Sequence, residues 1–316
     1  MSVAVKKRTR TKSGSSTSLW KKMKKQKILI FMIIPAFLIV LVFNYFPMYG
    51  ILMAFQDYKM AYGIWGSEWI GLENFRTFFS NPLAVRTIKN TILLGLYSFL
   101  WSFPAPIILA LLINELANQR FKKIVQTISY LPYFLSTVII VGMLKDFCSV
   151  NGGLFNQIIT ALGGSPINFF SESQWFRTLY IGSGIWQGVG WGTIIYLAAL
   201  SGVDVELYEA ATIDGANRFQ KMWNITLPAI LPTVTILMIM NVSGILGSDF
   251  QKVMLMYSPK IYDVADVIGT YTYREGIEGA RYSYTTAVGL FTSVISLIRL
   301  SITNFICKKL TENSLW

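Results

Sequence analysis

Six long apolar runs dominate this chain of 316 residues, and they limit what it can fold into. They cover approximately residues 28–50, 90–114, 124–144, 178–200, 229–248 and 283–307. A membrane-crossing helix needs about 20 predominantly apolar residues, so each run is long enough. Charged residues make up only 14% of the chain, against roughly 25% in soluble domains. We therefore predict an all-α polytopic membrane protein with six transmembrane helices.

The distribution of Lys and Arg predicts the orientation of these helices. Ten of the 28 basic residues lie in positions 1–27, with no acidic residue among them. With six spans, this tail, the loops after the second and fourth runs and the C-terminus all fall on one side, which the positive-inside rule makes cytoplasmic. We expect a basic cytoplasmic tail at 1–27, a six-span domain at 28–307 and a cytoplasmic tail at 308–316. The basic tail is interpreted as an orientation signal that contacts membrane lipid, not as a nucleic-acid site.

Several chemistries lack the residues they need. The chain has no histidine, which removes the commonest general base and the Ser-His-Asp triad. Its two cysteines, Cys148 and Cys307, fit no metal or redox spacing. No glycine is followed by lysine, so a Walker A loop is impossible. We predict no catalytic residue, no metal site and no cofactor in this chain; if ATP and Mg²⁺ are used, they bind a separate chain.

A patterned polar segment at 201–228 separates the fourth and fifth apolar runs. Glu209, Ala210 and Ala211 lie in a predicted helix at 205–214, whose acidic residues suit a helix N-terminus. Gly215, six residues after Glu209, is placed to end this helix as a C′ glycine. The pattern therefore predicts a short amphipathic helix with a sharp end.

A second short helix is predicted from Ala216 onward. Phe219 and Trp223 share one of its faces at i, i+4 spacing. The Leu227-Pro228 pair is expected to break the chain just before the fifth span. Two angled amphipathic helices with an aromatic face are typical of a surface that a partner protein binds.

The spacing of this segment resembles the EAA loop of ABC-transporter permeases: EAA at 209–211, Gly215, then I-x-L-P at 225–228. The likeness extends over nearly the whole chain. GIWQGVGW at 184–191, FQDY at 55–58, GLENF at 71–75, LP at 131–132 and NSLW at 313–316 resemble the carbohydrate branch that handles oligo- and polysaccharides. Arg299, inside the sixth span, departs from the family pattern.

The resemblance implies a type I importer architecture and an assembly. The chain would pair with a second homologous permease, two ATPase subunits would dock beneath the EAA loops, and an extracytoplasmic sugar-binding protein would deliver a saccharide. Glu209 would make the polar contact with the ATPase, Gly215 the turn, and Ala210 and Ala211 the close packing. The implied coupling set is Glu209, Ala210, Ala211, Asp214, Gly215, Ala216, Phe219, Ile225, Leu227 and Pro228.

Polar and aromatic residues within the spans are candidates for a translocation path, because polar groups in lipid tend to face a cavity or another helix. They are Trp186, Gln187 and Trp191 in the fourth run, with Asn241 and Asp249 in and after the fifth. The tryptophan rings suit the flat C–H faces of sugars, and the amides suit sugar hydroxyls. The alternative is helix packing, since glycines at contact spacing surround the tryptophans.

The predicted function is the pore-forming subunit of an ATP-driven importer of oligosaccharides or polysaccharide fragments, working by alternating access. An ABC permease for a non-sugar solute remains open, because the sequence chemistry barely distinguishes cargoes. A secondary transporter would need intramembrane carboxylates for ion coupling, and the predicted spans contain essentially none.

Overall fold

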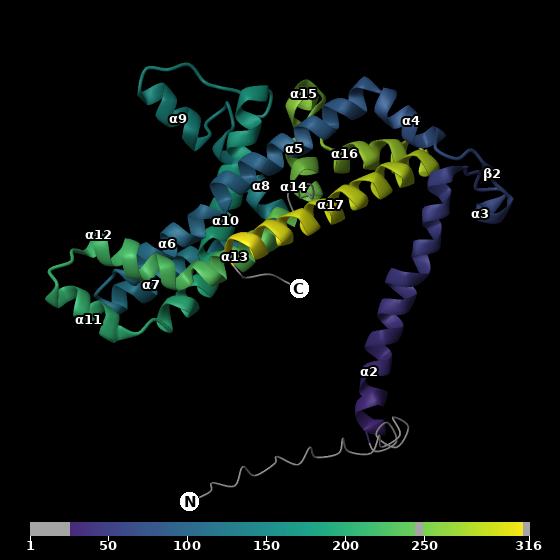
Figure 1. The fold of residues 1–316 in the computed structure, drawn as a ribbon. Coiled ribbons are helices and arrows are strands. Elements are labelled where there is room, and N and C mark those ends of the chain that lie inside the picture. Colours follow the sequence, from purple (N-terminus) through teal and green to yellow (C-terminus); the bar gives the residue numbers. More distant parts are fainter. Residues whose placement is uncertain (1–25, 244–248, 312–316) are drawn as a thin grey trace, which may run out of the picture. The chain divides into compact units, whose positions relative to one another are not determined.

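The computed structural model describes residues 26–243 and 249–311 (Figure 1). These residues are almost entirely helical, with one two-stranded sheet among them. The chain divides into two compact units, Met1–Leu52 and Met53–Trp316. The basic tail predicted at 1–27 lies outside the described residues up to position 25, as do positions 312–316 of the predicted C-terminal tail.

The first unit contains the first predicted span. It consists of α2 (Lys27–Val40), a π-helical turn η1 (Leu41–Tyr45) and the start of η2 (Phe46–Phe55), a 3-10 helix that runs on into the second unit. The candidate span Phe31–Phe55 has a mean hydropathy of 2.1. Its apolar side chains are largely exposed, which is the pattern of a helix whose solvent is lipid.

Three further helical stretches are long and apolar enough to cross a membrane. They are Pro82–Asn114, built from α5 (Pro82–Ser102) and α6 (Pro104–Asn114); Arg218–Val242, built from α12 (Arg218–Lys221), η4 (Met222–Thr226) and α13 (Leu227–Ser243); and Tyr282–Ile306 in α17 (Tyr282–Thr311). Two bent helix pairs meet the same test only when each pair is taken together. Counting each bent pair as one span gives six, in agreement with the predicted all-α, six-span class.

The third predicted span is not one straight helix. Helix α7 (Gln119–Tyr130) and the 3-10 turn η3 (Leu131–Phe134) meet α8 (Thr137–Phe147) at an angle of 101°. Pro132 cannot donate the amide hydrogen bond of a continuing helix. Ser136 then caps α8 by accepting a hydrogen bond from the amide of Ile139. The prediction of one helix over 124–144 is wrong because this proline and this cap outweigh the apolar composition.

The break predicted at Leu227-Pro228 is also wrong, since the helix runs on from Arg218 to Val242. The turn before Pro228 widens into the π-helix η4, which makes room for a residue without an amide proton. Within the widened turn, Asn224 Nδ2 donates to the carbonyl of Gln220 and Thr226 Oγ1 to that of Lys221. Proline is therefore accommodated inside a continuous helix.

The segment between the first two spans holds the sheet. Strand β1 (Gln56–Asp57) pairs antiparallel with β2 (Glu68–Trp69), and α3 (Gly63–Gly66) lies in their connection. Helix α4 (Glu73–Ser80) follows and buries Phe78 against rings of α17. This segment is therefore anchored to the last span.

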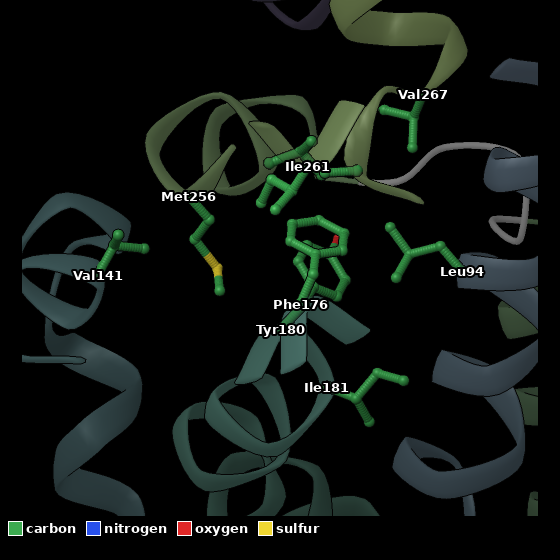
Figure 2. Close-up of a cluster of buried hydrophobic side chains, with 10 residues drawn as sticks. Leu94, Val141, Phe176, Tyr180, Ile181, Met256, Ile261 and Val267 are labelled. Atoms are coloured by element: carbon green, nitrogen blue, oxygen red, sulfur yellow. The ribbon is translucent and has the colours of Figure 1, made fainter. Parts of the chain in front are cut away.

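Residues 250–278, which precede α17, fold into short helices. They are α14 (Phe250–Met256), η5 (Pro259–Ile261), α15 (Tyr262–Ala265), α16 (Ile268–Tyr273) and the π-helix η6 (Arg274–Glu278). Their buried side chains surround Phe176 and Tyr180 of α10 (Ser173–Ser201), together with Leu94 of α5 and Val141 of α8 (Figure 2). This cluster is the main core of the second unit. Helix α9 (Leu154–Ala161) lies between α8 and α10 in the sequence.

An ion pair fixes this helical segment. Asp266 is fully buried, and both its carboxylate oxygens accept hydrogen bonds from Arg274, at 3.1 and 2.6 Å. Thr270 donates a further hydrogen bond to Asp266. The side chain of Asn90 on α5 donates to the main-chain oxygens of Asp263 and Asp266. The bidentate geometry and the extra donor satisfy a charge that would otherwise be costly to bury.

Helix α10 crosses its neighbours at glycines. A Cβ atom on Gly190 would collide with the main chain of Ser129 on α7, and one on Gly192 would lie 2.9 Å from Pro106 on α6. Small residues at such crossings let two helix backbones approach closely. The packing alternative weighed from the sequence is therefore confirmed for these two glycines.

Candidate functional site

The segment predicted as a coupling loop forms a helical hairpin, defined here as residues Val205–Thr226. Its first helix, α11 (Val205–Ile213), begins where Asp204 accepts a hydrogen bond from the amide of Glu206. It ends at Gly215, whose φ is +77°. The amide of Gly215 donates to the carbonyl of Thr212, and the amide of Ala216 donates to that of Ala211. This pattern is a complete Schellman motif, which confirms the predicted glycine end.

The second helix begins with a capping box. Asn217 accepts from the amide of Gln220, and the side chain of Gln220 accepts from the amide of Asn217. Helix α12 therefore begins at Arg218, two residues later than predicted from Ala216. The turn between the two helices is short because both ends are capped locally.

Two side-chain hydrogen bonds join the arms of the hairpin. The hydroxyl of Tyr208 on α11 lies 3.0 Å from Oγ1 of Thr226 on η4, and Thr226 is almost fully buried. Lys221 Nζ donates to Oγ1 of Thr212 at 2.7 Å. Below them, Leu227 packs on a cluster formed by α6, α10 and α13. The hairpin is therefore attached to the spans as one piece.

The hairpin carries large apolar side chains that none of the described residues covers. Ile213 is 87% exposed, Phe219 77% and Trp223 67%, and Leu207 is exposed as well. We call Leu207, Ile213, Phe219 and Trp223 the apolar knob. Exposed apolar side chains grouped in this way mark an interaction surface.

The remaining predicted coupling residues fall into two groups. Glu209, Ala210 and Asp214 are exposed on the hairpin, as is Pro228 beyond it; Ala211, Ala216, Ile225 and Leu227 are only partly exposed. None of the salt bridges among the described residues involves Glu209. The hairpin thus gathers the predicted coupling residues in one region, with Glu209 available to a partner chain.

The predicted path residues are not gathered into one site. Gln187 donates to the carbonyl of Leu135, at the bend between η3 and α8. Trp191 stacks on Tyr133 at 4.6 Å, with an angle of 4° between the ring planes. Both side chains therefore support the bend, which is a packing role that the sequence analysis weighed.

Asn241 and Trp186 line different cavities. Asn241 faces a cavity of about 300 Å³ between α10 and α13, whose α10 wall includes Gly184, Gly188 and Gly192. Trp186 lines a separate cavity of about 360 Å³ that lies against α8 and α9. The first of these adjoins both helices that carry the hairpin, so it is the better candidate for a path.

Asp249 caps α14 by accepting from the amide of Lys252. Sequence reasoning misses Lys252, which is buried: its Nζ donates to the carbonyl of Tyr180 at 2.9 Å and lies 4.9 Å from the centre of the Tyr180 ring. Burial lowers the pKa of Lys252 to about 8, although the charge of Asp249 opposes this shift. Asp249 and Lys252 therefore fasten α14 to α10. The apolar spacing of Val253 and Met256 was the available signal for this helix.

The family is settled by comparison with known proteins. Residues 85–312 match the model of the family described as "Binding-protein-dependent transport system inner membrane component". The chain belongs to this family. It is therefore a membrane-spanning permease subunit of a binding-protein-dependent ABC transporter, and its exposed hairpin lies within the matched region.

Relatives of this permease extend the match to almost the full chain. It is 43% identical over 304 residues to protein LplB of Bacillus subtilis (strain 168), covering 96% of each chain. It is 44% identical over 295 residues to the polygalacturonan/rhamnogalacturonan transport system permease protein YteP of the same organism, covering 93% of this chain and 92% of YteP.

A solved structure shares the fold. This permease is similar to a chain of a bacterial ABC transporter involved in the import of the acidic polysaccharide alginate, with a TM-score of 0.87 and 40% identity. The similarity covers 93% of this chain and 99% of that one. A second structure of the bacterial alginate transporter, in complex with its pentasaccharide-bound periplasmic protein, matches with a TM-score of 0.88.

Proposed function

We propose that this permease forms one half of the pore of an ATP-driven importer of oligosaccharides or polysaccharide fragments. Its relatives include a permease named for polygalacturonan and rhamnogalacturonan and a chain of an alginate transporter. A second, homologous permease completes the pore. An extracytoplasmic binding protein delivers the saccharide, as a periplasmic protein does in the alginate complex. ATP and Mg²⁺ bind to a pair of separate ATPase subunits, and this chain catalyses no covalent step.

The observation that carries this proposal is the hairpin with its uncovered apolar knob. The knob presents Phe219 and Trp223 one helical turn apart, which is the anchor spacing of a helix that lies in a partner's groove. Glu209 adds an exposed carboxylate to the same hairpin. Ala210, with its small side chain, allows a close approach. We assign this surface to the ATPase subunit.

The continuous helix from Arg218 to Val242 supports a route by which movement of the ATPase would reach the pore. Because no break separates Phe219 and Trp223 from α13, a displacement of these two rings moves α13 as a lever. The hydrogen bond between Tyr208 and Thr226 makes α11 follow. Alternating access then consists of the two hairpins of the paired permeases moving together and apart as the ATPases close and open.

The hairpin side of the membrane is assigned to the cytoplasm. Basic residues support this, since Arg218 and Lys221 lie on the hairpin and Lys308 and Lys309 in the last turn of α17. Both termini then lie inside the cell. Cysteines placed at Ser67 and Ser171 are expected to react with an external, membrane-impermeant thiol reagent, whereas cysteines at Ser18 and Asn313 are expected to stay unreacted.

Saccharide passage is assigned to the cavity lined by Asn241, between α10 and α13. Gln187, Trp191 and Asp249 contribute by positioning helices, and Trp186 lines the neighbouring wall of α10 in a separate cavity. Alanine variants of Gln187 and Asn241 separate the roles: Asn241→Ala is expected to assemble normally and transport poorly. Gln187→Ala is expected to lose complex yield, because it leaves the Leu135 carbonyl without its donor.

A tryptophan pair tests the assignment of the knob. Trp223→Ala removes an exposed ring of the knob, and Trp65→Ala removes a ring that is 89% exposed in the connection between β1 and β2. In vesicles containing the full complex, Trp223→Ala is expected to abolish ATP-driven saccharide uptake and to weaken ATPase binding. Trp65→Ala is expected to retain both. Equal behaviour of the two variants would refute the docking surface.

A further inference from the structure

A second cavity with sugar-binding chemistry lies on the last span, apart from the one at Asn241. It has a volume of about 480 Å³ and lies between α14, α16, η6 and α17. Volumes of roughly 300–1,000 Å³ are typical of small-molecule sites. We call it the α17 groove. None of its lining residues was singled out from the sequence.

Aromatic rings line one part of the groove. Phe250 of α14 and Tyr273 of α16 lie 5.5 Å apart with an angle of 43° between their planes, and Tyr282 at the start of α17 lines it as well. Phe250 is 38% exposed, and Tyr273 and Tyr282 are partly exposed, so the rings are accessible. Flat apolar rings beside polar groups provide the surface that a pyranose ring needs, because sugars have apolar C–H faces and polar edges.

Hydroxyl groups line another part. Thr292 Oγ1 donates to the carbonyl of Val288 at 2.8 Å, and Ser293 Oγ donates to that of Gly289 at 2.9 Å. With their protons used in the helix, both oxygens keep lone pairs for a hydrogen bond from a ligand. The groove therefore offers acceptors to sugar hydroxyls without leaving unsatisfied donors of its own at these positions.

Glycine keeps the groove open. A Cβ atom on Gly289 would meet nothing within 4 Å, so the space beside it is empty. Gly269 lies against Phe250, where a Cβ atom would come 3.5 Å from the ring. Any large side chain at position 289 would fill space that a ligand can use.

The groove lies on the polar side of α17, as helical spacing shows. Thr285, Gly289, Thr292, Ser296 and Arg299 recur at intervals of three or four residues and share one face. Leucine, isoleucine and valine occupy the other side at positions 290, 294, 297, 298 and 302. Polar side chains in a membrane helix avoid lipid and face a water-filled path or another helix. The apolar side is thus the one suited to lipid, and the groove opens away from it.

We propose that the α17 groove is a second saccharide subsite, which holds one sugar unit of a longer cargo while another occupies the cavity at Asn241. This inference rests on the proposed function, since it presumes that the cargo is a saccharide. The rings of Phe250 and Tyr273 stack on the sugar face, and Thr292 and Ser293 accept hydrogen bonds from its hydroxyls. A neighbouring helix is the rival occupant, because small residues also occur where helices pack.

The test fills the α17 groove in one variant and removes one of its aromatic rings in another. Gly289→Phe fills the empty space, Tyr273→Leu removes a flat ring, and Gly142→Phe is the control, since Gly142 also has nothing within 4 Å of its Cβ position but lies on α8. The complete complex is reconstituted in vesicles. Uptake is measured with fluorescent pentasaccharides of galacturonate, mannuronate and arabinose, alongside complex yield and basal ATP hydrolysis.

Gly289→Phe and Tyr273→Leu are each expected to lower kcat/KM for the transported pentasaccharide about tenfold or more, with complex yield and basal hydrolysis unchanged. Gly142→Phe is expected to match the wild type. If the wild type takes up a pentasaccharide and both groove variants keep the same kcat/KM, the subsite is overturned and the proposed importer function stands. A parallel loss of complex yield assigns the groove to helix packing and also overturns it. If the wild type takes up none of the three sugars, the proposed function itself fails.

Discussion

The Gly215 turn allows a quantitative test of the hairpin, because its constraint is purely conformational. Its φ of +77° lies in the left-handed region, and a Cβ atom there would meet no atom within 4 Å. A substitution therefore costs backbone energy without a steric clash. That cost is roughly 1–2 kcal/mol for an ordinary L-residue. Gly215→Ala should thus shift the local opening equilibrium of the turn by about 5–30-fold.

Amide hydrogen exchange measures this opening directly. The amide of Ala216 donates to Ala211 only while the Schellman motif is closed. In the assembled complex, Gly215→Ala should speed its exchange by the factor given above. Gly215→Asn should have a smaller effect, because asparagine tolerates this conformation, and Gly215→Val a larger one.

Gly202→Ala is the matched control, since Gly202 follows α10 with a φ of −90° and a Cβ atom there would only touch the carbonyl of Ala199 at 3.5 Å. It should leave the exchange of Ala216 within about twofold of the wild type. If Gly215→Ala and Gly202→Ala behave alike, the turn does not require a left-handed residue. If the turn requires a left-handed residue, saccharide uptake should be highest for Gly215→Asn, lower for Gly215→Ala and lowest for Gly215→Val. Membrane insertion should stay intact in all three variants.

Three further outcomes are expected. Glu209→Ala should abolish saccharide uptake and weaken ATPase binding in pull-down assays. The control Glu206→Ala, also exposed on α11, should cost only about 0.3–1 kcal/mol of helix stability and retain transport. Equal losses of uptake in the two variants would argue against a specific contact at Glu209. Tyr208→Phe should destabilise the hairpin by about 0.5–1.5 kcal/mol, and Thr226→Val by at least as much, because Thr226 also donates to the carbonyl of Lys221. The double variant should be no worse than Thr226→Val alone in thermal denaturation; additive losses would mean that the two hydroxyls do not pair. Burial lowers the pKa of Lys252 to about 8 from an ordinary value of 10.5, so between pH 8 and pH 10.5 the unfolded chain binds more protons than the folded chain. The free energy of unfolding should therefore rise with pH above about 8. Lys252→Met should flatten this rise, and an unchanged slope would contradict the pKa shift.

Most of the spans and the glycine end of α11 were predictable because their determinants are local. Long apolar runs need no tertiary information to indicate a membrane helix. The end of α11 follows from one glycine placed after an amphipathic helix, and Asp204 and Asn217 are ordinary N-cap residues. Each of these features depends on residues within a few positions of one another.

The bend before α8 and the unbroken helix at Pro228 were not predictable in the same way. Both contain a proline, yet Pro132 precedes a bend of 101° and Pro228 sits in a continuous helix. What differs is the surroundings. At the first, Ser136 caps a new helix and Gln187 supports the free carbonyl of Leu135. At the second, a π-turn and two local side chains satisfy the backbone. A distant residue such as Gln187 cannot be identified from local sequence.

Path residues were the least predictable part of the site. In a span where nearly every residue is apolar, the pattern does not reveal which face meets a cavity. Trp186 and Trp191 therefore looked equivalent in sequence, but the first lines a cavity against α8 and the second stacks on Tyr133. The α17 groove was missed for a related reason, because three of its walls are short helices that lie outside the long apolar runs.

The proposed coupling between the hairpin and the cavity at Asn241 has a structural route. The two helices that lead into the hairpin, α10 and α13, are also two walls of that cavity. At one end Tyr208 and Thr226 join the arms, and at the other Lys252 fastens α14 to the carbonyl of Tyr180 on α10. A force on the knob therefore reaches both walls through the joined arms of the hairpin. Loosening the Tyr208–Thr226 contact should allow α11 to move without α13, so ATP hydrolysis would continue while uptake falls.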